Sequence, residues 1–233
     1  MLTKLFLDTT VIFDYSDPTS STHPHAFKYM NENWIISTKV KEEIESVICR
    51  RNKLYSKLFA AINNEAVSEF NADTVFKFLI KEPASSSDQS YFKRISKYIY
   101  EKIKSKEDKM GALLYEITCL FAVLSSSINK TLFNLSNRAE RIISSCTDKN
   151  LISKIHKLFK RKGRCSNDCQ ILSDCIDYAV PIQEVVGFIT SDQEIISQRN
   201  GIIETAKKYY SLHIAPIQLY YITEQVDETY YQI

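Results

Sequence analysis

KLFLDTTVIFDY, at residues 4–15, is the stretch from which the rest of the chain is interpreted. Leu5, Phe6 and Leu7 form an apolar run that stops at Asp8 and two threonines. Such a run is typical of a central strand in a parallel sheet, buried on both faces and ending in a polar turn. Because ligands of open α/β sheets collect at the carboxyl ends of strands, Asp8 is a candidate site residue. The alternative is that Asp8 only caps the following helix.

Two further apolar runs repeat this pattern. WIIS at 34–37 predicts a second buried strand, followed by a helix at 39–51 that carries Glu43 in its first turns. VVGFIT at 185–190 predicts another strand, which ends at Ser191 and Asp192. A helix beginning with Ser166-Asn167-Asp168 precedes that strand and ends near Pro181; Asp168 is also a possible N-cap. We therefore expect Asp8, Glu43, Asp168 and Asp192 to converge on one edge of a parallel sheet.

Four carboxylates in one partly dehydrated space repel one another, and the repulsion costs on the order of several kcal/mol. A divalent cation relieves that repulsion, and hard oxygen ligands favour Mg²⁺ or Mn²⁺. The four acids therefore predict a metal-dependent phosphodiesterase, in which a metal-activated water attacks phosphorus.

The composition predicts a soluble protein whose charge is unevenly distributed. The chain has 233 residues, of which 44% are hydrophobic and 25% charged. Its net charge of +2 divides into −2 over 1–38, +11 over 39–164 and −7 over 165–233. Such asymmetry predicts a polyanion-binding middle, although Lys-rich helices can also be merely solvated. No signal peptide is expected, and the apolar stretch 111–128 is interpreted as a buried helix.

The middle of the chain shows amphipathic helical patterns separated by short breaks. We expect helices at 54–62, 72–80, 88–103, 109–128, 132–145 and 150–160. The last of them leads into a basic run whose side chains are predicted to contact RNA phosphates: Lys154, Lys157, Lys160, Arg161, Lys162 and Arg164. The alternative is that this run only solvates a helix.

The remaining segments complete the expected order of elements. Residues 16–25, with two prolines, predict a loop. After Asp192 we expect a short helix at 193–199, a strand at 212–214 and a closing helix at 217–226.

The cysteines predict neither zinc binding nor disulfides. Cys165, Cys169 and Cys175 lack the spacing of a zinc motif, and the nearest histidine is His156. Scattered cysteines within apolar patterns are typical of a reducing compartment, so a cytoplasmic location is expected.

Four short stretches, taken in order, resemble the PIN-domain family of nucleases: LFLDTTV, STKVKEEIES, SNDCQILSDCI and GFITSDQEI. The resemblance covers about 1–51 and 165–223 and leaves the helical middle unmatched. It implies a three-layer α/β/α sandwich around a short parallel sheet, formed by 1–51 and 165–233, with a helical insertion at 52–164. It also implies Mg²⁺ or Mn²⁺ at Asp8, Glu43, Asp168 and Asp192, and RNA, single-stranded in preference, as substrate.

By the same resemblance, Thr9 and Thr190 orient the acids or the attacking water. Thr10 stands where the family often has Asn or Ser. Glu43 is preferred to Glu42 and Glu45 because it directly precedes the apolar Ile44. Asp174 lies six residues after Asp168, about 600° around an ideal helix, and so points in another direction. Asp174 and Asp177 are interpreted as surface residues or as supports of the acids.

Other function classes fit less well. A phosphatase of the haloacid dehalogenase type needs a second acid where Thr10 stands. A non-catalytic RNA- or protein-binding module on the same scaffold is the main alternative, although it would not need all four acids. The helical middle is also a possible interface with a protein partner or a second copy of the chain.

Overall fold

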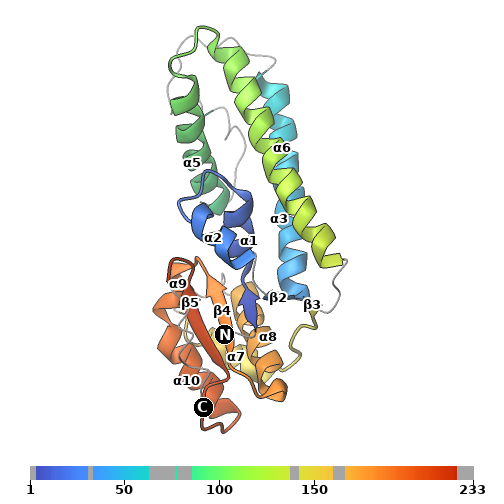
Figure 1. Cartoon of the computed structure of the whole chain (residues 1–233), viewed down its shortest axis with the longest axis vertical. Coiled ribbons are helices and arrows are strands. Elements are labelled where there is room, and N and C mark those ends of the chain that lie inside the picture. Colours follow the sequence, from blue (N-terminus) through green and yellow to red (C-terminus); the bar gives the residue numbers. More distant parts are fainter. Residues whose placement is uncertain are drawn as a thin grey trace. The chain divides into compact units, whose positions relative to one another are not determined.

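The structure is a computed structural model that describes residues 4–30, 34–62, 77, 86–136, 142–159 and 166–224. Its centre is a five-stranded sheet in the order β3-β2-β1-β4-β5, and every neighbouring pair is parallel. The strands are β1 (Leu5–Leu7), β2 (Trp34–Ser37), β3 (Ile142–Ile143), β4 (Val186–Thr190) and β5 (Ile217–Tyr221). The predicted α/β class with a parallel sheet is thereby confirmed (Figure 1).

The described helices follow the strands in βα order. They are α1 (Thr9–Ser16), α2 (His23–Met30), α3 (Thr38–Ile62), α5 (Ser86–Ile103), α6 (Lys109–Ser136), α7 (Lys149–His156), α8 (Ser166–Ile182), α9 (Gln193–Ser197) and α10 (Arg199–Tyr209). Within the described ranges, no helix is both long enough and apolar enough to cross a membrane.

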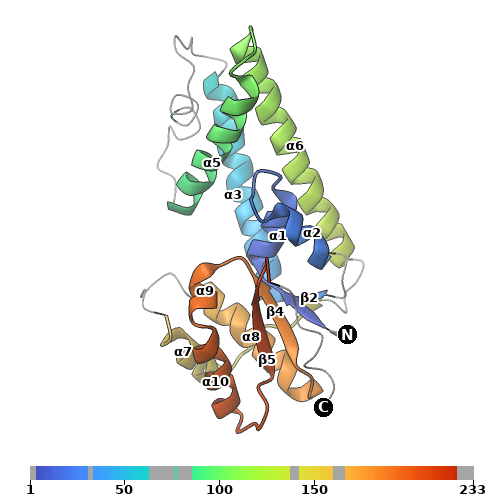
Figure 2. The same cartoon turned by 60° about the vertical axis from the view of Figure 1, so that its left-hand side comes forward.

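An aromatic pair packs between β1 and β4, the central strands of the sheet. Phe6 pairs with Phe188 in register, and their stacked rings lie 5.6 Å apart at the centroids. Both side chains are fully buried, as expected for strands covered on both faces. Helix α8 packs against β2, β4 and β5, α10 packs against β5, and α7 packs against both of these helices (Figure 2). The connection of β1 to β2 contains α1 and α2, and α1 packs against β4.

The chain divides into two compact units, Met1–Glu45 with Ile128–Ile233, and Ser46–Ser127. The first contains the whole sheet. The second contains α5 together with parts of α3 and α6. These boundaries differ from the predicted insertion at 52–164, because β3 and α7 lie within that range and belong to the sheet unit.

The helical middle confirms some predictions and corrects others. The helices expected at 88–103, 109–128 and 150–160 are present as α5, α6 and α7, and the one expected at 72–80 lies, except for residue 77, outside the described residues. The break expected between 51 and 54 is wrong, because α3 runs through it without a Gly or Pro to stop it. The helix expected at 132–145 is confirmed over 132–136, which are the last turn of α6, and is wrong over Ile142–Ile143, which pairs with β2. A two-residue strand is too short to carry a periodic signal.

The C-terminal predictions fail after Asp192. The strand expected at 212–214 is wrong, since these residues form no ladder and Ile214 is 63% exposed. The helix expected at 217–226 is wrong over 217–221, which form β5 beside β4. The sequence there alternates enough to fit a strand, and pairing with β4 decides it. Helix α10 was not predicted, because Asn200 and Gly201 near its start weaken the helical pattern. His23 and His25, assigned to a loop, lie in α2.

Candidate active site

The candidate site lies where the carboxyl ends of β1 and β4 meet. From β1 the chain proceeds through β2 to β3 on one side, then crosses to β4 and β5 on the other. The boundary between β1 and β4 is therefore a topological switch point, where open α/β sheets bind ligands. Asp8 extends this boundary, because its backbone N–H donates to the carbonyl of Ile189 at 3.0 Å.

The carboxylate of Asp8 is held by three donors. One oxygen accepts from the backbone N–H of Thr9, and the other from the hydroxyls of Thr10 and Thr190, each at 2.7 Å. Asp8 is also the N-cap of α1, so the capping alternative describes a real contact. Burial raises the pKa of Asp8 to about 6; the two hydroxyls oppose this rise, and the charges of Glu43 and Asp192 add to it.

Glu43 reaches the site from the first turns of α3. Its carboxylate accepts from the hydroxyl of Thr9 at 2.9 Å. Glu42 and Glu45 are exposed and face Lys39 and Lys41 on the same helix. Of the three acids considered from the sequence, the structure thus brings Glu43 to the neighbourhood of Asp8.

Asp192 is fixed at the end of β4 by its neighbours in the chain. Its carboxylate caps α9 by accepting from the backbone N–H groups of Glu194 and Ile195. Its own backbone N–H donates to the Thr190 hydroxyl at 3.0 Å. Thr190 therefore contacts two of the predicted acids, Asp8 and Asp192.

Asp168, in the first turn of α8, shows that the four acids share one electrostatic environment. Its pKa is raised to about 7, first by burial and then by the negative charges of Asp8, Asp192 and Glu43. A further acid, Glu194, contributes in the same direction. Four segments far apart in sequence thus bring the four predicted acids within interaction range.

The residues fit a cation through their charge rather than through preformed coordination. None of the ion pairs in the described part of the chain involves any of the four acids. In the same residues, no three acidic, histidine or cysteine side chains already stand together as a metal-ligand group. A cluster of carboxylates without basic partners is the donor chemistry that hard divalent cations select.

Two residues of the site were not assigned from the sequence. Thr10 donates to Asp8, lies 3.3 Å from the hydroxyl oxygen of Thr190 and accepts from the backbone N–H of Ser191 at 3.1 Å. Glu194 adds charge beside Asp168. Both lie two residues beyond a strand-end acid, and this spacing is the signal that identifies them.

The interpretation of Asp174 as a surface residue or a support of the acids is wrong. Asp174 is 1% exposed, and its carboxylate accepts from the backbone N–H of Cys146 and from the amide of Gln170. Helix α8 is covered by the sheet and by α7, so a residue that points away from Asp168 is still inside the protein. Asp177 is exposed, and the hydroxyl of Tyr210 donates to it.

The structure describes only the beginning of the predicted RNA-binding run. Lys154 is exposed on α7, and its ammonium lies 5.4 Å from the ring centroid of Tyr209. Lys157 is the exposed C-cap of the same helix. The other members, Lys160, Arg161, Lys162 and Arg164, lie outside the described residues.

The two described cysteines of the rejected zinc motif, Cys169 and Cys175, are buried in α8. Cys165 lies outside the described residues.

Comparisons of this chain with protein-family models, with curated proteins and with solved structures find no match.

Proposed function

We propose that this protein is a divalent-metal-dependent ribonuclease that hydrolyses phosphodiester bonds of RNA. The observation that carries the proposal is the clustering of Asp8, Glu43, Asp168 and Asp192, which come from four separate segments. The resemblance of the same segments to PIN-domain nucleases supports it. In this proposal the sheet unit, Met1–Glu45 with Ile128–Ile233, is a PIN-like core, and Ser46–Ser127 is an insertion into that core.

The four acids would hold Mg²⁺ or Mn²⁺, which when bound would polarise a phosphoryl oxygen and lower the pKa of an attacking water. Thr10 and Thr190 fix the orientation of the Asp8 carboxylate, and Thr9 fixes that of Glu43. The raised pKa values of Asp8 and Asp168 mean that the metal-free cluster carries protons close to neutral pH. Binding of a cation would release these protons.

The RNA strand would be held by basic side chains outside the cluster. The basic run that begins at Lys154 ends shortly before Asp168 in the sequence. RNA phosphates bound by that run would therefore be held close to the acids. RNA rather than another phosphodiester is proposed from the family resemblance and from the net charge of +11 over residues 39–164.

The test of the enzyme is cleavage of single-stranded RNA in Mn²⁺ or Mg²⁺, with EDTA expected to stop it. Glu43→Gln should remove the activity, whereas Glu42→Gln and Glu45→Gln serve as matched controls on the same helix and should retain it. Metal binding is measured in parallel by calorimetry.

Activity that persists in EDTA would contradict the proposal. Intact metal binding without cleavage of any RNA would favour the non-catalytic binding module instead.

The basic run has a separate test. Neutral replacement of Lys157, Lys160, Arg161 and Lys162 should weaken RNA binding and leave metal binding intact. The slope of log affinity against log salt is negative, and each lost phosphate contact should reduce its magnitude by about 0.7 for a single strand. An unchanged slope would mean that these side chains only solvate their surroundings.

A further inference from the structure

Helix α5, in the second compact unit, has one apolar and one basic face. Its apolar side chains are buried: Tyr91, Phe92, Ile95, Ile99 and Ile103. Lys93, Lys97, Tyr100 and Lys104 follow one another at spacings of four, three and four residues, which places them along one side of a helix. Lys104 stays in helical register, because its backbone N–H donates to the carbonyl of Tyr100 at 2.9 Å. We call these four residues the outer face of α5.

Among the described residues, two of the three lysines on the outer face have no ion-pair partner. Lys93 and Lys97 are exposed and take part in no ion pair of the described residues. Lys104 pairs with Glu101. Residues 93–106 hold six basic side chains and one acidic side chain, so the surplus of positive charge is large.

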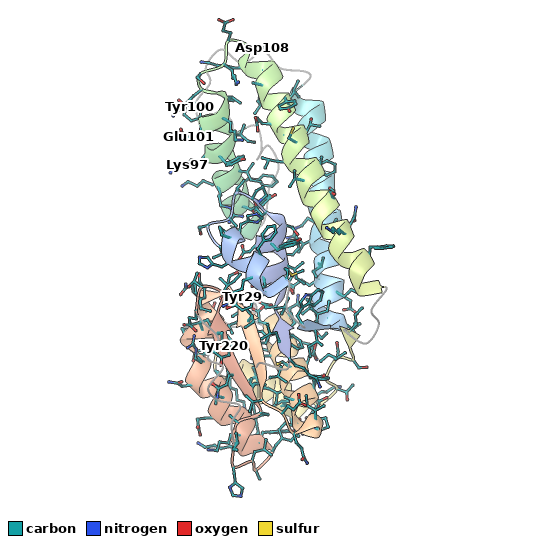
Figure 3. The ribbon with its side chains drawn as sticks, in the orientation of Figure 1. Tyr29, Lys97, Tyr100, Glu101, Asp108 and Tyr220 are labelled. Atoms are coloured by element: carbon teal, nitrogen blue, oxygen red, sulfur yellow. The ribbon has the colours of Figure 1, made fainter. Side chains whose placement is uncertain are left out.

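The outer face of α5 also carries an aromatic side chain, Tyr100, between the lysines. Figure 3 shows Lys97 and Tyr100 projecting from the same side of α5, with Glu101, the partner of Lys104, between them. Tyr100 is partly exposed to solvent. Lysines interleaved with an accessible aromatic ring are the pattern with which proteins bind single-stranded nucleic acid without sequence preference.

We propose that the outer face of α5 binds single-stranded RNA, with Lys93 and Lys97 contacting successive phosphates and Tyr100 stacking on a base. The identity of the ligand rests on the proposed function. The residues of the outer face belong to the second compact unit, whereas the four acids belong to the first.

The composition of this face favours RNA over a protein partner. The large hydrophobic side chains that are exposed in the described residues are Phe27, Tyr115, Val123, Phe133 and Ile214, and none of them lies on α5. Protein interfaces are built around a desolvated core that is poor in charge, which the outer face does not provide. Its charge is complementary to a polyanion.

The experiment measures binding of an unstructured oligouridylate by the full-length Asp8→Asn protein in EDTA, so that no cleavage occurs. Titrations at several salt concentrations give the slope of log affinity against log salt. Lys93→Gln with Lys97→Gln should reduce the magnitude of this slope by about 1.4, because each of the two lost phosphate contacts accounts for about 0.7. Lys93→Arg with Lys97→Arg should preserve it. Lys207→Gln with Lys208→Gln, on α10 of the other unit, is the matched control and should leave it unchanged.

Replacement of the aromatic ring tests the stacking contact. Tyr100→Ala should weaken binding about 5- to 150-fold at every salt concentration without changing the slope. Tyr100→Phe should bind like the parent, because it retains the ring. Thermal melts of each variant establish that the helix is intact.

An unchanged slope and affinity in the Gln pair, with a parent protein that binds RNA, would overturn this inference and leave the nuclease proposal standing. An equal loss in the Lys207/Lys208 control would also overturn it, because binding would then follow net charge alone. A parent that binds no oligouridylate in EDTA would overturn this inference alone, because the nuclease proposal is tested by cleavage in Mn²⁺ or Mg²⁺.

Discussion

Two buried carboxylates of the sheet unit, Asp8 and Asp174, both accept hydrogen bonds but differ in the charges around them. Asp174 is 1% exposed and lies among donors, including the backbone N–H of Cys146 at 2.7 Å and the amide of Gln170 at 2.8 Å. Asp8 is 3% exposed and also has three donors, but the negative charges of Glu43 and Asp192 act on its carboxylate and raise its pKa.

The difference separates a structural acid from an acid of the proposed active site. Asp174 accepts from the backbone N–H of Cys146, and Gln170 donates both to Asp174 and to the carbonyl of Cys146. Asp174 and Gln170 together therefore join α8 to the segment that follows β3. The cluster around Asp8 instead brings acids together without basic partners among the described ion pairs. Such an arrangement destabilises the metal-free fold and is typical of a binding or catalytic site.

The largest effect is expected for the functional acids. Asp8→Asn or Asp192→Asn should reduce RNA cleavage by about a thousandfold, corresponding to roughly 4 kcal/mol of transition-state stabilisation. The metal-free variants should melt at the same temperature as the parent or higher, since a charge is removed from a repelling cluster. A marked drop in melting temperature would show that these residues act as caps instead.

The pH dependence of stability should distinguish Asp8 from an ordinary surface acid. Its pKa rises from 3.8 to about 6 in the folded protein, so between these values the folded state holds a proton that the unfolded state has lost. Stability therefore falls as pH rises through this window, by on the order of 3 kcal/mol from Asp8. The raised pKa of Asp168 extends the fall to about pH 7.

Thermal melts from pH 4.5 to 8 in EDTA check this prediction. The advantage of Asp8→Asn over the parent should grow with pH, and Mn²⁺ should reduce the fall in the parent. An advantage that is constant across the pH range would contradict the raised pKa of Asp8.

The structural acid should respond in stability rather than in catalysis. Asp174→Ala leaves the backbone N–H of Cys146 without its acceptor and removes one of the two acceptors of the Gln170 amide, and should lower the free energy of unfolding by about 2 kcal/mol. Asp177→Ala, three residues along the same helix and exposed, should change it by less than about 0.5 kcal/mol. Urea unfolding of both variants measures the difference. Equal effects would refute the assignment of Asp174 as a tie between segments.

The smallest effect is expected for Thr10, which positions Asp8 without carrying charge. Thr10→Val removes the donor to Asp8 and the acceptor for Ser191, which should lower the free energy of unfolding by about 1 kcal/mol. Cleavage should fall about tenfold through the loosened carboxylate. Thr10→Ser should restore both properties, and failure of this rescue would mean that the methyl group of Thr10 matters rather than its hydroxyl.

The sequence alone was sufficient for elements whose signal is local. The runs LFL, WIIS and VGFIT are apolar on both faces and bounded by polar residues, and all three became buried strands. Because parallel strands end at a common edge, the acids beyond these runs were predicted to meet, and Asp168 lies within range of the other three.

Tertiary contacts decided what local patterns left ambiguous. Ile142–Ile143 and Ile217–Tyr221 are strands because β2 and β4 present free edges to pair with, although both segments were predicted as helix. Asp174 is internal because α8 is covered on two sides, which helical periodicity measured from Asp168 does not reveal. Local sequence fixes a preference of a fraction of a kcal/mol per residue, whereas pairing and burial act on whole segments and therefore prevail.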